Sequence, residues 1–333
     1  MAGKCLKHLL LFFFLSAAAI VDTAKESVVD TGKTAEYYNK KDYKDLGSID
    51  SGHFGAVSKI EEKKTRKIYA LKTVTPGAEG YAHAANEIKA LRQFDHENII
   101  KMVASTDITN RRKSNPVYIV LEHMPCDLYR AIKTLPEIKE NIREILHQIL
   151  KGVAHIHSKK LAHGDIKPAN ILIDLKTMAV KICDFGFCCE GKEEEEILGK
   201  TIDGYYIDIL SVVSLMVRLY LGESSSCLFY RGMFIDIYDP ECFIKTKREG
   251  GVLPGSILEG LHGEMEAVVS KNGLDLFLEL IASERTGVST VTTEALEHPF
   301  FAEGREQDPL PKTQSDVQEL STREPKRRRL CSR

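Results

Sequence analysis

The chain has 333 residues, of which 43% are hydrophobic and 28% charged, and its formal net charge is −2. These values are typical of a globular protein with enough length for one large domain or two lobes. A net charge so close to zero gives no reason to expect nucleic acid as a partner. The eight cysteines form no C-x-x-C pair and are too sparse for a disulfide framework. The sequence therefore indicates neither a zinc site nor a disulfide-stabilised scaffold.

Residues 1–23 have the features of a secretory signal peptide or an N-terminal anchor. Lys4 and Lys7 precede an apolar run that extends from Leu9 to Val21. A run of this length is too short for a comfortable membrane span and fits the core of a signal peptide. We therefore expect a contact with the secretory pathway or with a membrane through this segment. The alternative is a packed N-terminal helix in a protein of the cytoplasm or nucleus.

The next part of the chain is predicted to contain a linker and then a small sheet with one helix. Residues 24–42 are polar and charged, which favours a linker. A helix is predicted over residues 82–94, because Ile88, Leu91 and Phe94 recur at helical spacing. Short β-prone runs, bounded by glycine and charged residues, predict strands at 46–49, 55–60, 67–74 and 117–121.

The second half of the chain is predicted to be mainly helical. Residues 206–221 are strongly apolar but too few to span a membrane, so they are expected to form a buried central helix. Residues 223–263 contain Gly, Pro and Ser breaks and give no clear assignment. The tail at 302–333 is polar and basic and is expected to be disordered. Helical spacing predicts the remaining helices at 138–157, 264–281 (one helix or two) and 292–297.

Two short motifs carry side chains that phosphoryl transfer requires. The first is H-G-D-I-K-P-A-N at residues 163–170, and the second is D-F-G at residues 184–186. Together they supply two carboxylates, a lysine and a carboxamide between β-prone segments. In phosphoryl transfer one Asp orients the attacking hydroxyl, a lysine neutralises charge on the phosphoryl group, and an Asn and a second Asp hold Mg²⁺.

These motifs resemble the catalytic loop and the magnesium-binding loop of the eukaryotic protein kinase family, in its serine/threonine form. The resemblance implies that Asp165 accepts the hydroxyl proton and that Lys167 neutralises the phosphate. It implies that Asn170 and Asp184 bind Mg²⁺. Asp208 resembles the family's central-helix aspartate, which braces the backbone of the catalytic loop.

The resemblance extends to the nucleotide-binding half of the family's site. The G-H-F-G-A-V run at 52–57 is similar to the later part of the kinase glycine loop. Residues 70–72 (A-L-K) are similar to the strand that carries the phosphate-binding lysine, and residues 121–124 fall where the adenine-binding hinge is expected. ATP and Mg²⁺ are therefore the implied cofactors. The implied ATP-binding residues are Ile49, Gly52, Gly55, Val57, Ala70, Lys72, Glu87, Glu122 and Met124.

Three features depart from the family pattern. Asp50 replaces the first glycine of the glycine loop, and Gly164 replaces the arginine that commonly clasps a phosphorylated activation loop. The stretch between Asp184 and Asp208 is shorter than usual by roughly a dozen residues and has no A-P-E. A run of glutamates at 193–196 occupies much of this stretch. The missing arginine argues against switching by phosphorylation of the loop, and the short segment leaves peptide docking open.

The chain is thus predicted to have an α+β, two-lobed, protein-kinase-like fold over residues 43–301. The small β-rich N-lobe is expected at 43–121 and the larger helical C-lobe at 125–301. The implied function is transfer of the γ-phosphoryl of ATP to a serine or threonine of a protein substrate, whose identity the sequence does not reveal. One alternative is a pseudokinase that acts as a nucleotide-binding scaffold or regulator, and a weaker one is a small-molecule kinase.

Overall fold

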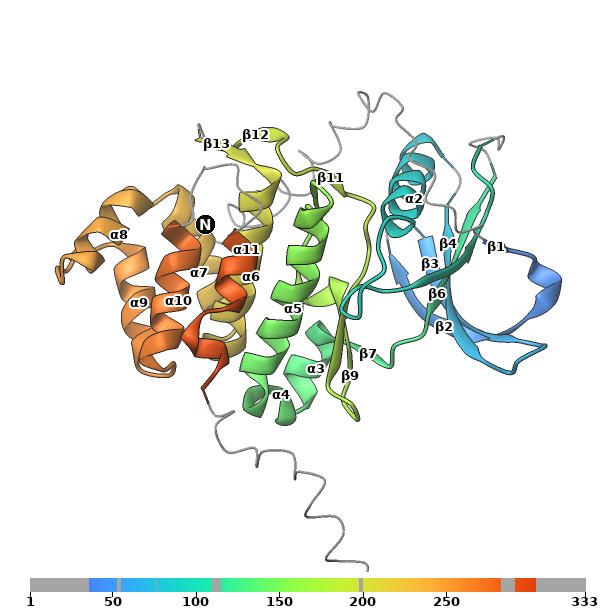
Figure 1. Ribbon diagram of the computed structural model, residues 1–333, viewed down its shortest axis with the longest axis horizontal. Coiled ribbons are helices and arrows are strands. Elements are labelled where there is room, and N and C mark those ends of the chain that lie inside the picture. The colour runs from blue at the N-terminus through green and yellow to red at the C-terminus, as the bar shows by residue number, and fades with distance from the viewer. Residues whose placement is uncertain are drawn as a thin grey trace, which may run out of the picture.

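The computed structural model describes residues 36–52, 55–75, 77–109, 115–197, 200–282 and 291–303. These residues form a sheet-rich N-lobe and a larger helical C-lobe (Figure 1). The predicted α+β, two-lobed architecture is therefore confirmed. The predicted signal segment, the first part of the predicted linker and the tail from residue 304 lie outside the described residues.

The N-lobe is built on a six-stranded sheet in the order β1-β5-β6-β4-β3-β2. Neighbouring strands are antiparallel, except that β1 pairs with β5 in parallel. The inner face carries Val74 and Ile119, which join the main hydrophobic core together with the helix α2. The strands are β1 (Glu36–Tyr37), β2 (Tyr43–Gly52), β3 (Gly55–Glu62), β4 (Ile68–Val74), β5 (Met102–Ser105) and β6 (Val117–Glu122).

The prediction of a linker over residues 24–42 is wrong for its last seven residues. Residues 36–37 form β1, and the 3-10 helix η2 (Lys40–Asp42) follows. Tyr38 lies between them and packs on Tyr118 and Tyr43, with ring centroids 5.0 and 5.7 Å apart. These aromatic contacts cover a small apolar cluster on the outer face of the sheet, which explains why a polar-looking segment becomes ordered.

The helix α2 (Ala78–Leu91) packs against the inner face of this sheet. It begins four residues before the predicted start and ends three residues before Phe94. Phe94 lies beyond the helix but remains partly buried, with its ring centroid 5.1 Å from that of Phe185. The apolar spacing therefore identified residues of one core, although the last of them is not helical.

The C-lobe helices surround two central ones, α5 and α6 (Figure 1). The predicted helix over 138–157 is broken at Asn141, whose side chain donates to the carbonyl of Glu137 at 2.8 Å. The unassigned stretch 223–263 forms α7, α8 and most of α9. The helices are α3 (Leu128–Thr134), α4 (Glu137–Glu140), α5 (Ile142–Ser158), α6 (Gly204–Leu221), α7 (Glu223–Phe234), α8 (Pro240–Arg248), α9 (Ile257–Glu266), α10 (Lys271–Ala282) and α11 (Val291–Leu296).

The central helix α6 is buried, as its composition predicts. Among the described residues it is the one helix with the length and apolarity to cross a membrane, and 72% of that stretch is buried inside the lobe. Asp203 caps its first turn by accepting from the backbone N–H of Tyr206 at 2.8 Å. Gly222, with φ of 100°, ends the helix in a conformation that favours glycine.

Short strands and 3-10 helices flank the loops that hold Asp165, Lys167 and Asp184, and one 3-10 helix includes Asn170. Three strands form a sheet in the order β10-β9-β7, β11 pairs with β8, and β12 and β13 form a hairpin. The strands are β7 (Cys126–Asp127), β8 (Leu161–Ala162), β9 (Ile171–Asp174), β10 (Ala179–Ile182), β11 (Cys189–Glu190), β12 (Glu194–Ile197) and β13 (Lys200–Asp203). The remaining 3-10 helices are η3 (Pro168–Asn170) and η4 (Pro299–Phe301).

Candidate active site

The loop between β8 and η3 is fixed by Asp208 of α6. The carboxylate of Asp208 is fully buried and accepts from the backbone N–H groups of His163 at 2.7 Å and Gly164 at 2.9 Å. A third contact, of 3.0 Å, joins its Oδ2 to Nε2 of His157. Because two of these partners are backbone groups of the loop, Asp208 sets the path of the chain into Asp165.

Three polar side chains converge in that loop. Oδ2 of Asp165 accepts from Nζ of Lys167 at 2.6 Å and from Nδ2 of Asn170 at 2.8 Å. The same amide nitrogen donates to the backbone carbonyl of Asp165 at 2.8 Å. Because these bonds use the nitrogen of Asn170, its Oδ1 is the atom with which Asn170 can ligate a metal. Burial raises the pKa of Asp165, and the charge of Lys167 partly offsets that effect.

Backbone contacts tie this loop to the segment that carries Asp184. The N–H of Cys183 donates to the carbonyl of Asn170 at 2.9 Å. The carbonyl of Cys183 lies 3.0 Å from Nε2 of His163. Asn170, at the end of η3, and Asp184, in the loop after β10, therefore lie on adjacent segments of the C-lobe.

Lys72 joins the N-lobe to this edge. Its Nζ donates to Oε2 of Glu87 at 2.6 Å and to Oδ1 of Asp184 at 2.8 Å. The side chains of Lys72 and Glu87 are 13% and 0% exposed, and that of Asp184 is 32% exposed. The three residues come from β4, α2 and the loop after β10. The pairs therefore form only when α2 packs close to both the sheet and that loop.

The electrostatics of this cluster follow from burial and from the single cation at its centre. Burial would lower the pKa of Lys72, but the two carboxylates outweigh it and raise that pKa. Burial raises the pKa of Glu87 to about 7 against the opposing charge of Lys72. Burial would also raise the pKa of Asp184, but Lys72 prevails and lowers it to about 2. Asp184 is thus held ionised, the form that binds a metal.

The loop that presents Asp184 is held in an unusual backbone conformation. Asp184 has φ of 66°, in the left-handed region that residues other than glycine rarely adopt. The next residue, Phe185, is fully buried, with ring centroids 5.1 Å from Phe94 and 4.8 Å from His163. The buried ring anchors the loop, and the strain is of the kind that packed functional sites maintain.

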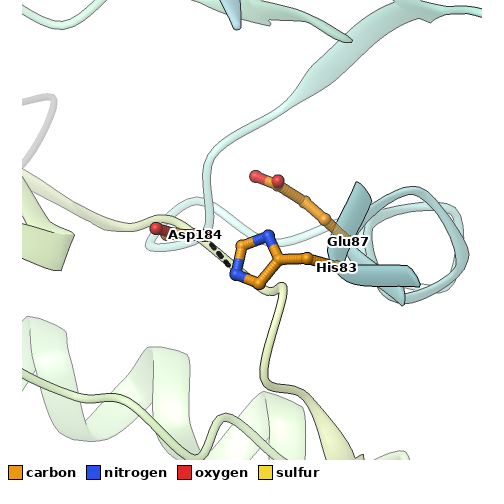
Figure 2. A group of neighbouring side chains, drawn as sticks. All are labelled: His83, Glu87 and Asp184. Carbon is orange, nitrogen blue, oxygen red and sulfur yellow. Dashed lines mark ion pairs between the residues drawn. The ribbon is translucent and has the colours of Figure 1, made fainter. Parts of the chain in front are cut away.

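His83 lies one turn before Glu87 on α2 and faces the same loop (Figure 2). Its Nε2 lies 3.7 Å from Oδ1 of Asp184, and the residue is 5% exposed. A Cβ on Gly186 would lie 1.8 Å from the His83 ring, so the ring occupies space that only glycine leaves open. Burial and the charge of Lys72 lower the pKa of His83 to about 4, so the imidazole is neutral near pH 7. Sequence reasoning missed His83, although its i−4 spacing from Glu87 places both on one helix face.

Val57, one of the predicted glycine-loop residues, lies beside Lys72. Val57 of β3 is in register with Lys72 of β4, and Gly52 of β2 is in register with Gly55 of β3. Gly55 has φ of 151°, and a Cβ there would lie 2.0 Å from the carbonyl oxygen of Thr73. Only glycine therefore fits at this position.

Asp50, at the position of the missing glycine, reaches across to the C-lobe. Its Oδ2 lies 3.4 Å from Nη2 of Arg130 on α3, whose Nε lies 3.3 Å from Oδ2 of Asp127. The side chains of Asp50 and Arg130 are 60% and 54% exposed. The sequence identified Asp50 as a departure but gave no indication of this partner.

Of the remaining predicted ATP contacts, Ala70, Glu122 and Met124 lie around the connection between the lobes, and Ile49 lies on β2. Ala70 pairs with Leu121 across β4 and β6, and Met124 is partly buried against the main core. Ile49 is 38% exposed on β2. The carboxylate of Glu122 accepts from the N–H of Lys101 at 2.7 Å and pairs with Lys181 at 3.0 Å. Both partners contact Oε1, and the backbone N–H of Glu122 donates to the carbonyl of Lys101 at 2.9 Å.

The shortened segment before α6 closes on itself as the β12–β13 hairpin. Ile197 and Ile202 of the hairpin are 8% and 6% exposed and belong to the main core. The N–H of Gly204 donates to the carbonyl of Glu193 at 3.1 Å, which ties the hairpin to the start of α6. Sequence reasoning missed this hairpin. The available signal was the two isoleucines flanked by polar residues.

The match to a known family agrees with this geometry. The family model described as "Protein kinase domain" matches residues 43–210, which is half of the chain and includes every predicted site residue. The chain belongs to the protein kinase family.

Proposed function

We propose that this kinase is catalytically active and transfers the γ-phosphoryl of ATP to a serine or threonine of a protein. The observation that carries the proposal is the double ion pair of Lys72, 2.6 Å from Glu87 and 2.8 Å from Asp184. It joins the nucleotide-binding lysine to the metal-binding aspartate in one arrangement. In a protein kinase both the lysine–glutamate pair and the aspartate must be in place for transfer.

The residues present fit ATP and Mg²⁺. Asp184 is held ionised and its side chain is 32% exposed, so it is accessible to a cation. Asn170 offers Oδ1, because its amide nitrogen is bonded to Asp165. Oxygen ligands of this kind suit Mg²⁺, which when bound neutralises the phosphate charge. Lys72 would contact the phosphates, and the backbone at Glu122 and Met124 would lie against the adenine.

The catalytic step is assigned to Asp165 and Lys167. Asp165 would accept the proton of the attacking hydroxyl through its carboxylate, and Asn170 and Lys167 hold that carboxylate in position. Lys167 carries the positive charge that would compensate the transferred phosphoryl group. The preference for serine and threonine over tyrosine is supported by the resemblance of the D-x-K-x-x-N motif to the serine/threonine kinases.

The second candidate is a pseudokinase that binds nucleotide and regulates a partner. It is favoured by Asp50 in the glycine loop and by the short hairpin where a longer activation segment is usual. It shares the prediction of ATP binding but not that of phosphoryl transfer.

Phosphoryl transfer separates the two candidates. Purified full chain is incubated with γ-labelled ATP, Mg²⁺ and a mixed protein extract, beside the Asp165→Asn variant, and labelled residues are identified by acid hydrolysis. The proposal predicts labelled phosphoserine or phosphothreonine only with the wild type. Equal labelling by both proteins, or none by either while ATP still binds, would favour the pseudokinase.

We further propose that the N-terminal segment directs the chain to the secretory pathway or a membrane. The support is its sequence: a basic start followed by an apolar run of signal-peptide length. A fusion of residues 1–30 to a fluorescent reporter tests this. A reporter that remains uncleaved and diffuse in the cytoplasm or nucleus would contradict it.

A further inference from the structure

One buried cluster beside the proposed nucleotide site contains a ligand type that phosphoryl transfer does not use. His83, Glu87 and Asp184 each offer one ligand atom, and these atoms all lie within 4.8 Å of one another. His83 and Glu87 come from consecutive turns of α2, and Asp184 faces them from the loop after β10 (Figure 2). Lys72 is the residue that currently bridges the two carboxylates.

We propose that His83, Glu87 and Asp184 form a second cation site, selective for a divalent first-row transition metal such as Zn²⁺. One imidazole and two carboxylates make a ligand set that suits Zn²⁺ or Co²⁺, whereas Mg²⁺ prefers oxygen ligands alone. The site uses Asp184 in a different way from Mg–ATP. It does not require that the protein transfer phosphate.

The carboxylate of Glu87 supports the site independently. Glu87 is fully buried, and its Oε2 binds Lys72. Its Oε1 is also buried and accepts no hydrogen bond from the described residues. A buried carboxylate oxygen without a donor is costly, and a bound cation would remove that cost.

The ring of His83 is held in place for ligation. Gly186 leaves the space that the ring fills, and Phe187 packs edge-on against it at a centroid distance of 4.9 Å. The Nε2 atom faces Asp184 at 3.7 Å. Ligands of a tetrahedral Zn²⁺ lie about 2.0–2.2 Å from the metal and hence roughly 3.3 Å from one another. Shifts of about 1 Å in the three side chains would therefore close the site.

Metal and Mg–ATP exclude each other at this site. The ammonium of Lys72 occupies the position between Glu87 and Asp184, so a dication must displace it from at least one carboxylate. Such displacement removes the lysine from the phosphate position and takes Asp184 from Mg²⁺. A bound transition metal therefore inhibits nucleotide binding.

A second cluster with similar composition lacks these properties. Asp275 and Glu279 of α10 lie 3.7 Å from Nε2 of His298, but both acids are exposed. Nδ1 of His298 accepts from the N–H of Phe300 at 3.2 Å, so Nε2 carries the proton in the neutral ring. A protonated nitrogen cannot ligate a metal, and this cluster is an ordinary surface charge arrangement.

Cobalt titration of the nucleotide-free full chain tests the proposal directly. Co²⁺ replaces Zn²⁺ and reports its ligands through its visible absorption. We expect one site with the spectrum of nitrogen and oxygen ligands, lost in His83→Gln and retained in His262→Gln, a change on the distant helix α9. Equal binding by wild type and His83→Gln, or no saturable binding, would overturn the proposal. A near-UV thiolate band would do so too, because it would place the metal on cysteines such as Cys189.

The Lys72→Met variant keeps the test decisive if His83→Gln fails to fold. Removing the competing ammonium should tighten Co²⁺ binding by roughly tenfold or more. Unchanged or weaker binding in Lys72→Met would contradict the proposed competition. This readout is independent of kinase activity. In the wild type, if ATP binds, saturating Mg–ATP should abolish the cobalt spectrum, and a spectrum that persists would place the metal elsewhere.

Discussion

Among the ion pairs that join the lobes, two groups differ clearly in burial. Lys72, Glu87 and Asp184 are 13%, 0% and 32% exposed, whereas Asp50 and Arg130 are 60% and 54% exposed. Coulombic attraction is strong where water is excluded and weak where water and salt screen it. The buried group can therefore control nucleotide and metal binding. The exposed pair between Asp50 and Arg130 is expected to contribute little.

The largest effect is expected from Asp165→Asn. This change removes the carboxylate proposed to accept the hydroxyl proton while keeping the size of the side chain. We expect the rate of phosphoryl transfer to fall by about 10³-fold, which corresponds to about 4 kcal/mol of barrier. Initial-rate assays at saturating ATP measure it. Asp174→Asn at the end of β9 is the matched control, and a similar loss in both would contradict the assigned role.

The next effect concerns stability. Asp208→Ala leaves the N–H groups of His163 and Gly164 buried without an acceptor. We expect the free energy of unfolding to fall by roughly 3 kcal/mol, measured by urea denaturation. Asp107→Ala, which removes an exposed turn contact, should cost far less than Asp208→Ala. Equal losses of stability in the two variants would show that the stabilising effect of the Asp208 hydrogen bonds does not come from their burial.

A smaller effect is expected from pH. His83 has a pKa near 6.5 in the unfolded chain and about 4 in the folded protein. Between pH 7 and pH 5 the unfolded chain therefore binds more protons at this residue, and stability falls as pH falls. This contribution is about 2 kcal/mol. Urea denaturation at both pH values should show that His83→Gln loses about 2 kcal/mol less than the wild type. If the free energy of unfolding changed with pH equally in wild type and His83→Gln, the claim that His83 is buried and neutral would be refuted.

The smallest effect is expected at the exposed pair. A double-mutant cycle of Asp50→Asn and Arg130→Gln should give a coupling free energy below about 1 kcal/mol, because exposed pairs contribute little. Thermal denaturation at low and high salt measures it, and the coupling should shrink with salt. A coupling that exceeds this bound and persists in high salt would remove the distinction between the two groups.

The sequence predicted the two lobes and the family motifs because both have short-range signals. The D-F-G and D-x-K-x-x-N runs are contiguous, and the apolar spacing in α5 and the apolarity of α6 report burial directly. The break at Asn141 was not predicted, because the apolar spacing continues across it. The helices α7 and α8 were not predicted, because Gly, Pro and Ser near their ends interrupt the apolar spacing.

Long-range contacts account for what the sequence missed at the site. The partner of Asp50 lies eighty residues away on α3. His83 required knowledge that α2 packs against Gly186, more than a hundred residues further along the chain. The β12–β13 hairpin depends on two isoleucines, Ile197 and Ile202, that pack into the core of the C-lobe. In each case the local sequence shows the type of side chain but not the distant residue that it contacts.

Calorimetric titration with ATP most directly tests whether the buried Lys72–Glu87–Asp184 cluster, rather than the exposed Asp50–Arg130 pair, controls nucleotide binding. Wild type, Lys72→Met, Asp184→Ala and Asp50→Asn are compared with and without Mg²⁺. We expect Mg²⁺-dependent binding in the wild type, its loss in Lys72→Met and Asp184→Ala, and a change within about fivefold in Asp50→Asn. Binding that survives in Asp184→Ala, or that is lost equally in Asp50→Asn, would contradict the claim that the buried cluster controls the nucleotide site.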